Sequence, residues 1–340
     1  MNRIRRSLGL LMTGKLPDEA PRDIPQISKE EVAEAREFFP MPKFFVFGYA
    51  RSGTTLLARL LRLHPDVHCN WQAHFFTRPP LLSGMLQQQR FGDWLGRPSN
   101  RWNRGRDLSP VALRAMSDYI LERDALKEGK RVVGDKSPNV LMAGKAVDEL
   151  HRVYPDAVLV YIVRDGRDAL LSHRFQNFID GEQFLTRKDL SIRNRFARDP
   201  EAFIAQKRSI FSAKSMQRMA ADWARNVTET HQRGRQLYSE RYFSLRFEDL
   251  LVRPYEMLAR IWTLLGVESL GMEERVAKEM EKNPDADWQQ EKAPELAQAL
   301  EKGRKGSWRD FYTQDDVAHF KSLAGEALVS WGYEEGPDWQ

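Results

Sequence analysis

Residues 44–55 read Phe44-Phe-Val-Phe-Gly48-Tyr-Ala-Arg51-Ser-Gly53-Thr54-Thr55, and the architecture of the 340-residue chain can be inferred from them. The run begins with apolar residues and is stopped by a glycine, which is typical of a strand buried on both faces of a parallel sheet. From Gly53 onward, leucines recur at helical spacing until His64 and Pro65. This succession of strand, loop and helix predicts half of a βαβ unit.

Further apolar runs predict strands at residues 131–134, 157–163 and 242–246, and each precedes a helical pattern. The alternation predicts an α/β protein with a P-loop-like three-layer fold, in which helices cover both faces of a central parallel sheet. We expect an extended, proline-rich lead-in over residues 1–42 and a single domain over residues 43–335. The charged stretch 181–214 carries little strand signal and predicts a helical insertion or mobile lid.

The composition is that of a globular protein, with 41% hydrophobic and 30% charged residues. The net charge of +5 suits an anionic ligand, yet it is too small to indicate nucleic-acid binding. Cys69 is the only cysteine, so an intrachain disulfide is excluded and a reducing compartment is favoured. Every apolar run is broken by charge before it reaches membrane length. We therefore expect a cytoplasmic protein without a transmembrane segment.

The loop from Gly48 to Thr55 has the pattern of a phosphate cradle. It joins a buried strand to a helix, where backbone N–H groups and the positive end of the helix converge on an anion. In nucleotide hydrolases a lysine follows the second glycine, but here Thr54 takes that place and the cation is Arg51, inside the loop. A P-loop kinase or nucleotide hydrolase therefore remains an alternative, although this loop lacks the lysine that such enzymes carry.

Two other segments carry basic residues at expected ligand-binding positions. Arg164 follows the strand at 157–163, and Ser172 lies about two helical turns further on, so both can point at one phosphate. Open parallel sheets bind ligands at this carboxyl edge. Near the C-terminus, Gly303-Arg304-Lys305-Gly306 forms a basic, glycine-flanked loop ahead of Trp308.

These segments, together with Gly134-Asp-Lys-Ser-Pro138 and Arg246-Phe-Glu-Asp-Leu250, resemble in order and spacing the sulfotransferases that use 3′-phosphoadenosine 5′-phosphosulfate (PAPS). The motifs resemble most closely those of the heparan, carbohydrate and tyrosylprotein sulfotransferases, and the C-terminal loop resembles that of the cytosolic enzymes. The resemblance implies transfer of a sulfuryl group from PAPS to a hydroxyl, or less often an amine, with release of adenosine 3′,5′-bisphosphate (PAP). It implies donor-binding roles for Arg51, Ser52, Gly53, Thr54, Thr55, Arg164, Ser172, Phe247, Arg304, Lys305 and Gly306.

Catalysis requires charge on the departing phosphate to be neutralised and a proton to be removed from the acceptor. We assign the first role to Arg51 and Lys136, and no metal is expected because no cluster with ligand spacing occurs. Gln72 stands where glycan and tyrosylprotein sulfotransferases carry a glutamate base, and glutamine cannot accept a proton. His74 is the nearest titratable group and our candidate base, with Asp135 and His68 as alternatives.

The acceptor does not follow from any one motif. Residues 91–107 combine Trp94 and Trp102 with four arginines, so we expect this segment to contribute to the acceptor pocket. A carbohydrate, or another small or glycosylated molecule, is the expected partner. The alternative from another class is a non-catalytic protein that binds polyanions or nucleotides, suggested by a pI near 9.2.

Overall fold

A computed structural model describes residues 22–78, 81–282, 308–336 and 339 of the protein. Their centre is a five-stranded sheet in the order β2-β3-β1-β4-β5, and every neighbouring pair is parallel. The strands are β1 (Lys43–Gly48), β2 (Val67–Trp71), β3 (Val132–Lys136), β4 (Val158–Val163) and β5 (Tyr242–Arg246). The loop after Gly48 therefore leaves the central strand at the carboxyl edge of the sheet.

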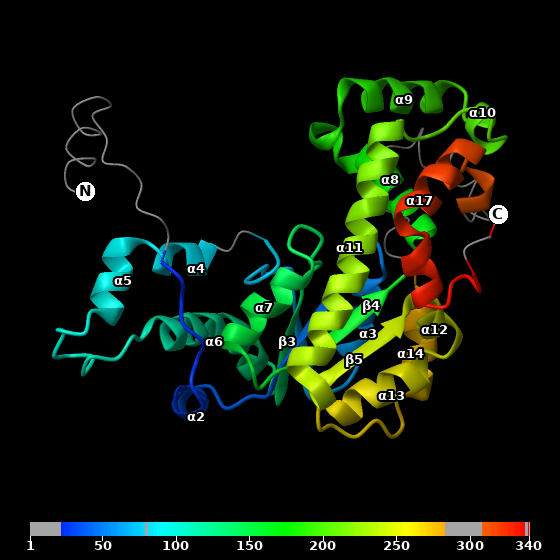
Figure 1. The fold of residues 1–340 in the computed structure, drawn as a ribbon. Coiled ribbons are helices and arrows are strands. Elements are labelled where there is room, and N and C mark those ends of the chain that lie inside the picture. Colours follow the sequence, from blue (N-terminus) through cyan, green and yellow to red (C-terminus); the bar gives the residue numbers. More distant parts are fainter. Residues whose placement is uncertain (1–21, 79–80, 283–307, 337–338, 340) are drawn as a thin grey trace, which may run out of the picture.

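Helices cover both faces of this sheet, which confirms the predicted three-layer α/β fold (Figure 1). Alternate residues of β1 and β4 point into two separate apolar clusters, because successive strand residues face opposite sides. One cluster is closed by α6 (Ser109–Lys127), α7 (Gly144–Val153), α8 (Gly166–Asp180), α11 (Ala213–Tyr238) and α17 (Gln314–Ser330). The other is closed by α3 (Thr54–Leu61), α12 (Phe247–Val252), α13 (Pro254–Leu264) and α14 (Glu273–Met280).

The strand β2 is the one element of the sheet that the sequence does not predict. It reads Val67-His-Cys-Asn-Trp71, and its polar residues interrupt any apolar run. Each of these polar groups has its own partner: the ring of His68 pairs with Glu128 at 2.9 Å, and the Asn70 amide donates to two backbone carbonyls. A polar residue can occupy a buried strand when its hydrogen bonds are satisfied.

Short helices make up the segments outside the sheet. Residues 22–42 contain α2 (Lys29–Phe38), which begins at a capping box formed by Ser28 and Glu31. α4 (Leu81–Leu86) and α5 (Gln89–Gly96) precede α6, and α5 lies at the opposite end of the molecule from α17 (Figure 1). Residues 181–214 hold η1 (Glu182–Phe184), α9 (Arg187–Arg198) and α10 (Glu201–Ile204), while movement of this segment as a lid stays a prediction. Within the described ranges, no helix has the length and apolarity needed to cross a membrane.

Candidate active site

The loop between β1 and α3 is held in a conformation that only some residues tolerate. Arg51 and Gly53 both have positive φ, at 65° and 87°, and the Ser52 N–H donates to the Tyr49 carbonyl at 3.2 Å. A Cβ atom at Gly53 would lie 2.2 Å from the Phe247 ring, so the position requires glycine. The buried Ser52 hydroxyl has no hydrogen-bond partner among the described residues. An unsatisfied buried donor beside a helix N-terminus fits a loop that binds an anion.

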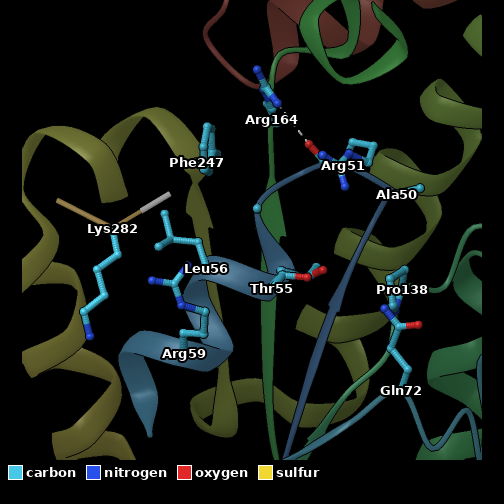
Figure 2. A pocket seen from close by; sticks show the side chains of 12 residues that line it. Ala50, Arg51, Thr55, Leu56, Arg59, Gln72, Pro138, Arg164, Phe247 and Lys282 are labelled. Atoms are coloured by element: carbon cyan, nitrogen blue, oxygen red, sulfur yellow. Dashed lines mark hydrogen bonds between the residues drawn. The ribbon is translucent and has the colours of Figure 1, made fainter. Parts of the chain in front are cut away.

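A first cavity of about 370 Å³ opens above this loop (Figure 2). Its lining combines the loop and the first residues of α3 with Gln72, Pro138 and Phe247. The cationic side chains in the lining are Arg51, Arg59, Arg164 and Lys282. Such a concentration of positive charge around exposed N–H groups can bind a ligand that carries several phosphates.

Six of the predicted donor-binding residues line this cavity, namely Arg51, Gly53, Thr54, Thr55, Arg164 and Phe247, whereas Ser52 and Ser172 are not in its lining. Arg164 donates through Nη1 to the Arg51 carbonyl at 3.2 Å, and its guanidinium lies 5.0 Å from the centre of the Phe247 ring. Arg51 donates through Nε to the Ser172 hydroxyl at 3.1 Å, so the loop after β1 and the helix after β4 are in contact. Arg304, Lys305 and Gly306 lie outside the described residues.

Lys136 lies beneath the loop. Its ammonium group donates to the Thr55 hydroxyl at 3.2 Å and lies 4.9 Å from the centre of the Trp71 ring. The side chain is buried at the carboxyl end of β3, directly beside β1. Lys136 can therefore place its charge close to the helix N-terminus at which an anion would bind.

A second cavity, of about 700 Å³, adjoins the first, because Ala50, Gln72 and Pro138 line both. Its remaining apolar and aromatic side chains come from the loop after β1, the segment after β3, η1 and α11, and they are Tyr49, Val140, Leu141, Phe184 and Met219. Its titratable side chains include His74 and His173. The two cavities thus meet beside Ala50, in the loop that follows β1.

His74 lies in the second cavity with a ring nitrogen available. Its backbone has φ of 53°, its N–H donates to the Ser137 hydroxyl at 3.0 Å, and Nδ1 lies 2.7 Å from the Thr77 hydroxyl. Nε2 is buried and has no partner among the described residues. Burial, with smaller effects of Arg78 and Lys136, lowers the pKa of His74 to about 4, so the imidazole is neutral at neutral pH. A neutral imidazole with a vacant nitrogen can accept a proton.

The alternative bases occupy other environments. Asp135 accepts from the Ala73 N–H at 3.0 Å and from the Ser137 hydroxyl at 2.6 Å, and burial raises its pKa to about 6. It therefore fixes the turn that carries His74. His68 is paired with Glu128 within the sheet. Neither Asp135 nor His68 is among the described residues that line the two cavities.

Helix α11 fixes the segment that follows β3. This segment lies between the two cavities, because its Pro138 lines both. The Asn139 amide donates to the Thr230 hydroxyl at 2.8 Å, and the Asn226 amide donates to the Asn139 carbonyl at 3.1 Å. The Tyr161 hydroxyl of β4 donates to the side-chain oxygen of Asn226 at 2.9 Å. This buried network sets the position of Pro138 and Val140 relative to the sheet.

Several lining residues are missing from the sequence prediction, among them Arg59, Lys282 and His173. Arg59 donates to Glu279 at 2.9 Å, and Lys282 contacts the other oxygen of the same carboxylate at 2.7 Å. Arg59 lies one helical turn after Thr55, so helical spacing would have identified it. His173 directly follows Ser172, which the sequence already indicates as a donor-binding residue. Lys282 has no signal in the sequence, because it reaches the site only through the packing of α14.

None of the residues 91–107 is in the lining of the two cavities described here, so their contribution to an acceptor pocket stays a prediction. Trp94 and Trp102 stack on each other, with ring centres 5.2 Å apart, and neither belongs to the lining of either cavity. The two rings are more than half exposed. The helix that carries Trp94, α5, lies away from α8 and α11, which contribute to the second cavity (Figure 1).

The parallel α/β fold with an anion-binding loop after its central strand defines a phosphate-binding class of protein. Residues 42–194 match the model of the Sulfotransferase family. Nodulation protein NoeE of Sinorhizobium fredii is 32% identical over 145 residues, which cover 38% of this chain and 31% of that protein. Protein-tyrosine sulfotransferase of Drosophila melanogaster is 27% identical over 230 residues, which cover 67% and 38%.

The chain thus matches only about a third of the length of these curated relatives. Among solved structures, a sulfotransferase from Alicyclobacillus acidocaldarius matches over 85% of this chain and 98% of its own, with a TM-score of 0.42 and 19% identity.

Proposed function

We propose that the protein transfers a sulfuryl group from PAPS to a hydroxyl group, with the donor in the first cavity and the acceptor in the second. The observation that carries this proposal is the junction of the two cavities at Ala50, Gln72 and Pro138. Transfer between two bound molecules requires their reacting ends to meet, and a shared wall beside an anion-binding loop supplies such a place. The single cysteine, the buried Cys69, supports a cytoplasmic location.

The first cavity fits the charges of this donor. Backbone N–H groups at the start of α3 and the unpaired Ser52 hydroxyl would hold the phosphosulfate end, while Arg164 and Ser172 would hold the 3′-phosphate. Phe247 offers an apolar face for the adenine. The bound donor supplies an activated sulfuryl group whose leaving group is a phosphate.

The residues around the junction have distinct tasks in the proposed reaction. His74 Nε2 accepts the proton of the acceptor hydroxyl, whose oxygen forms the new bond to sulfur. Lys136 and Arg51 stabilise the negative charge that develops on the departing phosphate oxygen as the bond from sulfur to that oxygen breaks.

The test is a comparison of ligands by thermal stability of the purified chain. PAP should raise the Tm more than ATP with magnesium, because the first cavity has arginines at Arg51 and Arg164 in place of a terminal lysine. Arg164→Ala should abolish stabilisation by PAP. Selective stabilisation by ATP with magnesium would favour a kinase or nucleotide hydrolase. Stabilisation by heparin but by neither nucleotide would favour a polyanion-binding protein.

A further inference from the structure

The outer wall of the second cavity exposes large apolar side chains. Leu141 follows β3 and Phe184 belongs to η1, and they are 65% and 71% exposed. Val140 and Met219 continue this apolar surface into the cavity. Apolar groups gathered around a cavity gain free energy when a ligand with an apolar body removes them from water.

Two arginines border the same wall without ion-pair partners among the described residues. Arg218 lies in α11 and Arg78 in the segment after His74, and both line the cavity. Asp222, which also lines the cavity one helical turn after Arg218, is paired with Arg225 at 3.1 Å. The surface therefore offers positive charge that no carboxylate of the described chain neutralises.

The electrostatics of the inner cavity are consistent with this arrangement. Burial lowers the pKa of His173 to about 4, with further contributions from Arg51, Arg218 and Arg174. His74 is affected in the same direction by burial and by Arg78. Both imidazoles are therefore neutral at neutral pH, and the cations at the wall set the charge of the cavity.

We propose that the second cavity selects amphiphilic anions as acceptors, in the form of an alcohol or phenol with an apolar body and a carboxylate. The apolar body lies against Leu141, Phe184 and Met219, Arg218 binds the carboxylate, and the hydroxyl lies at the His74 end. A sugar would present hydroxyl groups on all sides and leave most of them without partners on this wall. This inference rests on the proposed function, because it assigns the acceptor of that reaction.

The experiment measures binding of matched probes to the full chain saturated with PAP, using isothermal titration calorimetry. One pair is 12-hydroxydodecanoate and its amide, and the second is 3-(4-hydroxyphenyl)propanoate and its amide. At least one carboxylate should bind about tenfold more tightly than its amide, as expected for a charge-assisted contact at a partly exposed site. Turnover with PAPS should show the same order of preference.

Arg218→Gln should remove this preference while the affinities for the amide and for PAP stay unchanged. Arg235→Gln is the matched control, because Arg235 is exposed on the same helix, is outside the cavity lining and has no ion-pair partner among the described residues. The control should keep the wild-type preference for the carboxylate. A preference that survives in Arg218→Gln would overturn the role of this arginine.

Other outcomes separate this proposal from the proposed function. If wild-type protein binds PAP but distinguishes neither pair, or binds neither pair, the assignment of an anionic amphiphile is wrong. Tighter binding of a neutral oligosaccharide or of an acidic tyrosyl peptide than of every probe would also overturn it. If wild-type protein fails to bind PAP, the proposed function itself is wrong and the acceptor assignment is overturned with it.

Discussion

The two cavities differ in how the chain builds them. The first is dominated by one continuous segment, the loop after β1 with the start of α3, and arginines from nearby elements complete it. The second draws on the turn after β2, the segment after β3, α8, η1 and α11, which are far apart in the sequence. The first is strongly cationic, whereas the second has apolar walls and neutral imidazoles. The cavity proposed to bind phosphate thus follows from a local sequence pattern, whereas the cavity proposed to bind the acceptor follows from tertiary packing.

The largest effect is expected from Gly53→Ala, which breaks the first cavity alone. The new methyl group would meet the Phe247 ring at 2.2 Å, and the residue would keep a φ of 87° that alanine disfavours. We expect the affinity for PAP to fall by about 100-fold or more, measured by calorimetry.

Gly266→Ala is the matched control for this variant. Gly266 has a similar φ of 75°, but a methyl group there meets no atom within 4 Å. It should cost about 1 kcal/mol of stability and leave PAP affinity unchanged. Equal losses of PAP affinity in the two variants would contradict the proposed role of the Gly53 and Phe247 contact.

His74→Gln should lower the rate of the proposed transfer and leave the first cavity unchanged. Loss of the proton acceptor should lower kcat by about 100- to 10,000-fold, with an unchanged dissociation constant for PAP. His68→Gln tests the alternative, because His68 pairs with Glu128 and lines neither cavity in the described part of the chain. Wild-type turnover in His74→Gln would show that another group accepts the proton.

The smallest effect concerns the stability of the protein in acid. The pKa values of His74 and His173 are lowered by burial to about 4, whereas each unfolded group titrates near 6.5. Between these values the unfolded chain binds more protons, so the free energy of unfolding should decrease as pH falls from about 6.5 to 4. We expect a contribution of order 1 kcal/mol after allowance for the solvent around His74.

Urea unfolding at several pH values measures this dependence. The double variant His74→Gln and His173→Gln should lose less stability on acidification than the wild type. His319→Gln is a suitable control, because His319 is only partly buried on α17 and its ring contacts the Asp315 carbonyl at the surface. An unchanged pH dependence in the double variant would show that these imidazoles are not buried as described.

The sequence predicts the features that have a local signal. Four of the five strands follow from apolar runs, and the cradle follows from two glycines, Arg51 and the threonines of α3. β2 lacks such a signal because His68 and Asn70 are satisfied by partners distant in sequence. Lys282 and the stacked pair of Trp94 and Trp102 show the same limit, since only packing determines whether a side chain reaches a cavity.

Helix α11 has a consequence for how such a protein can diversify. Arg218, Met219 and Asp222 face the second cavity, whereas Asn226 and Thr230 are buried and bind the helix to β4 and to the segment after β3. The two sets share one helix but have separate tasks, so substitutions in the first set leave the anchoring hydrogen bonds in place. Under the proposed function, the preference for an acceptor can therefore be changed through one turn of α11 without altering the residues of the first cavity.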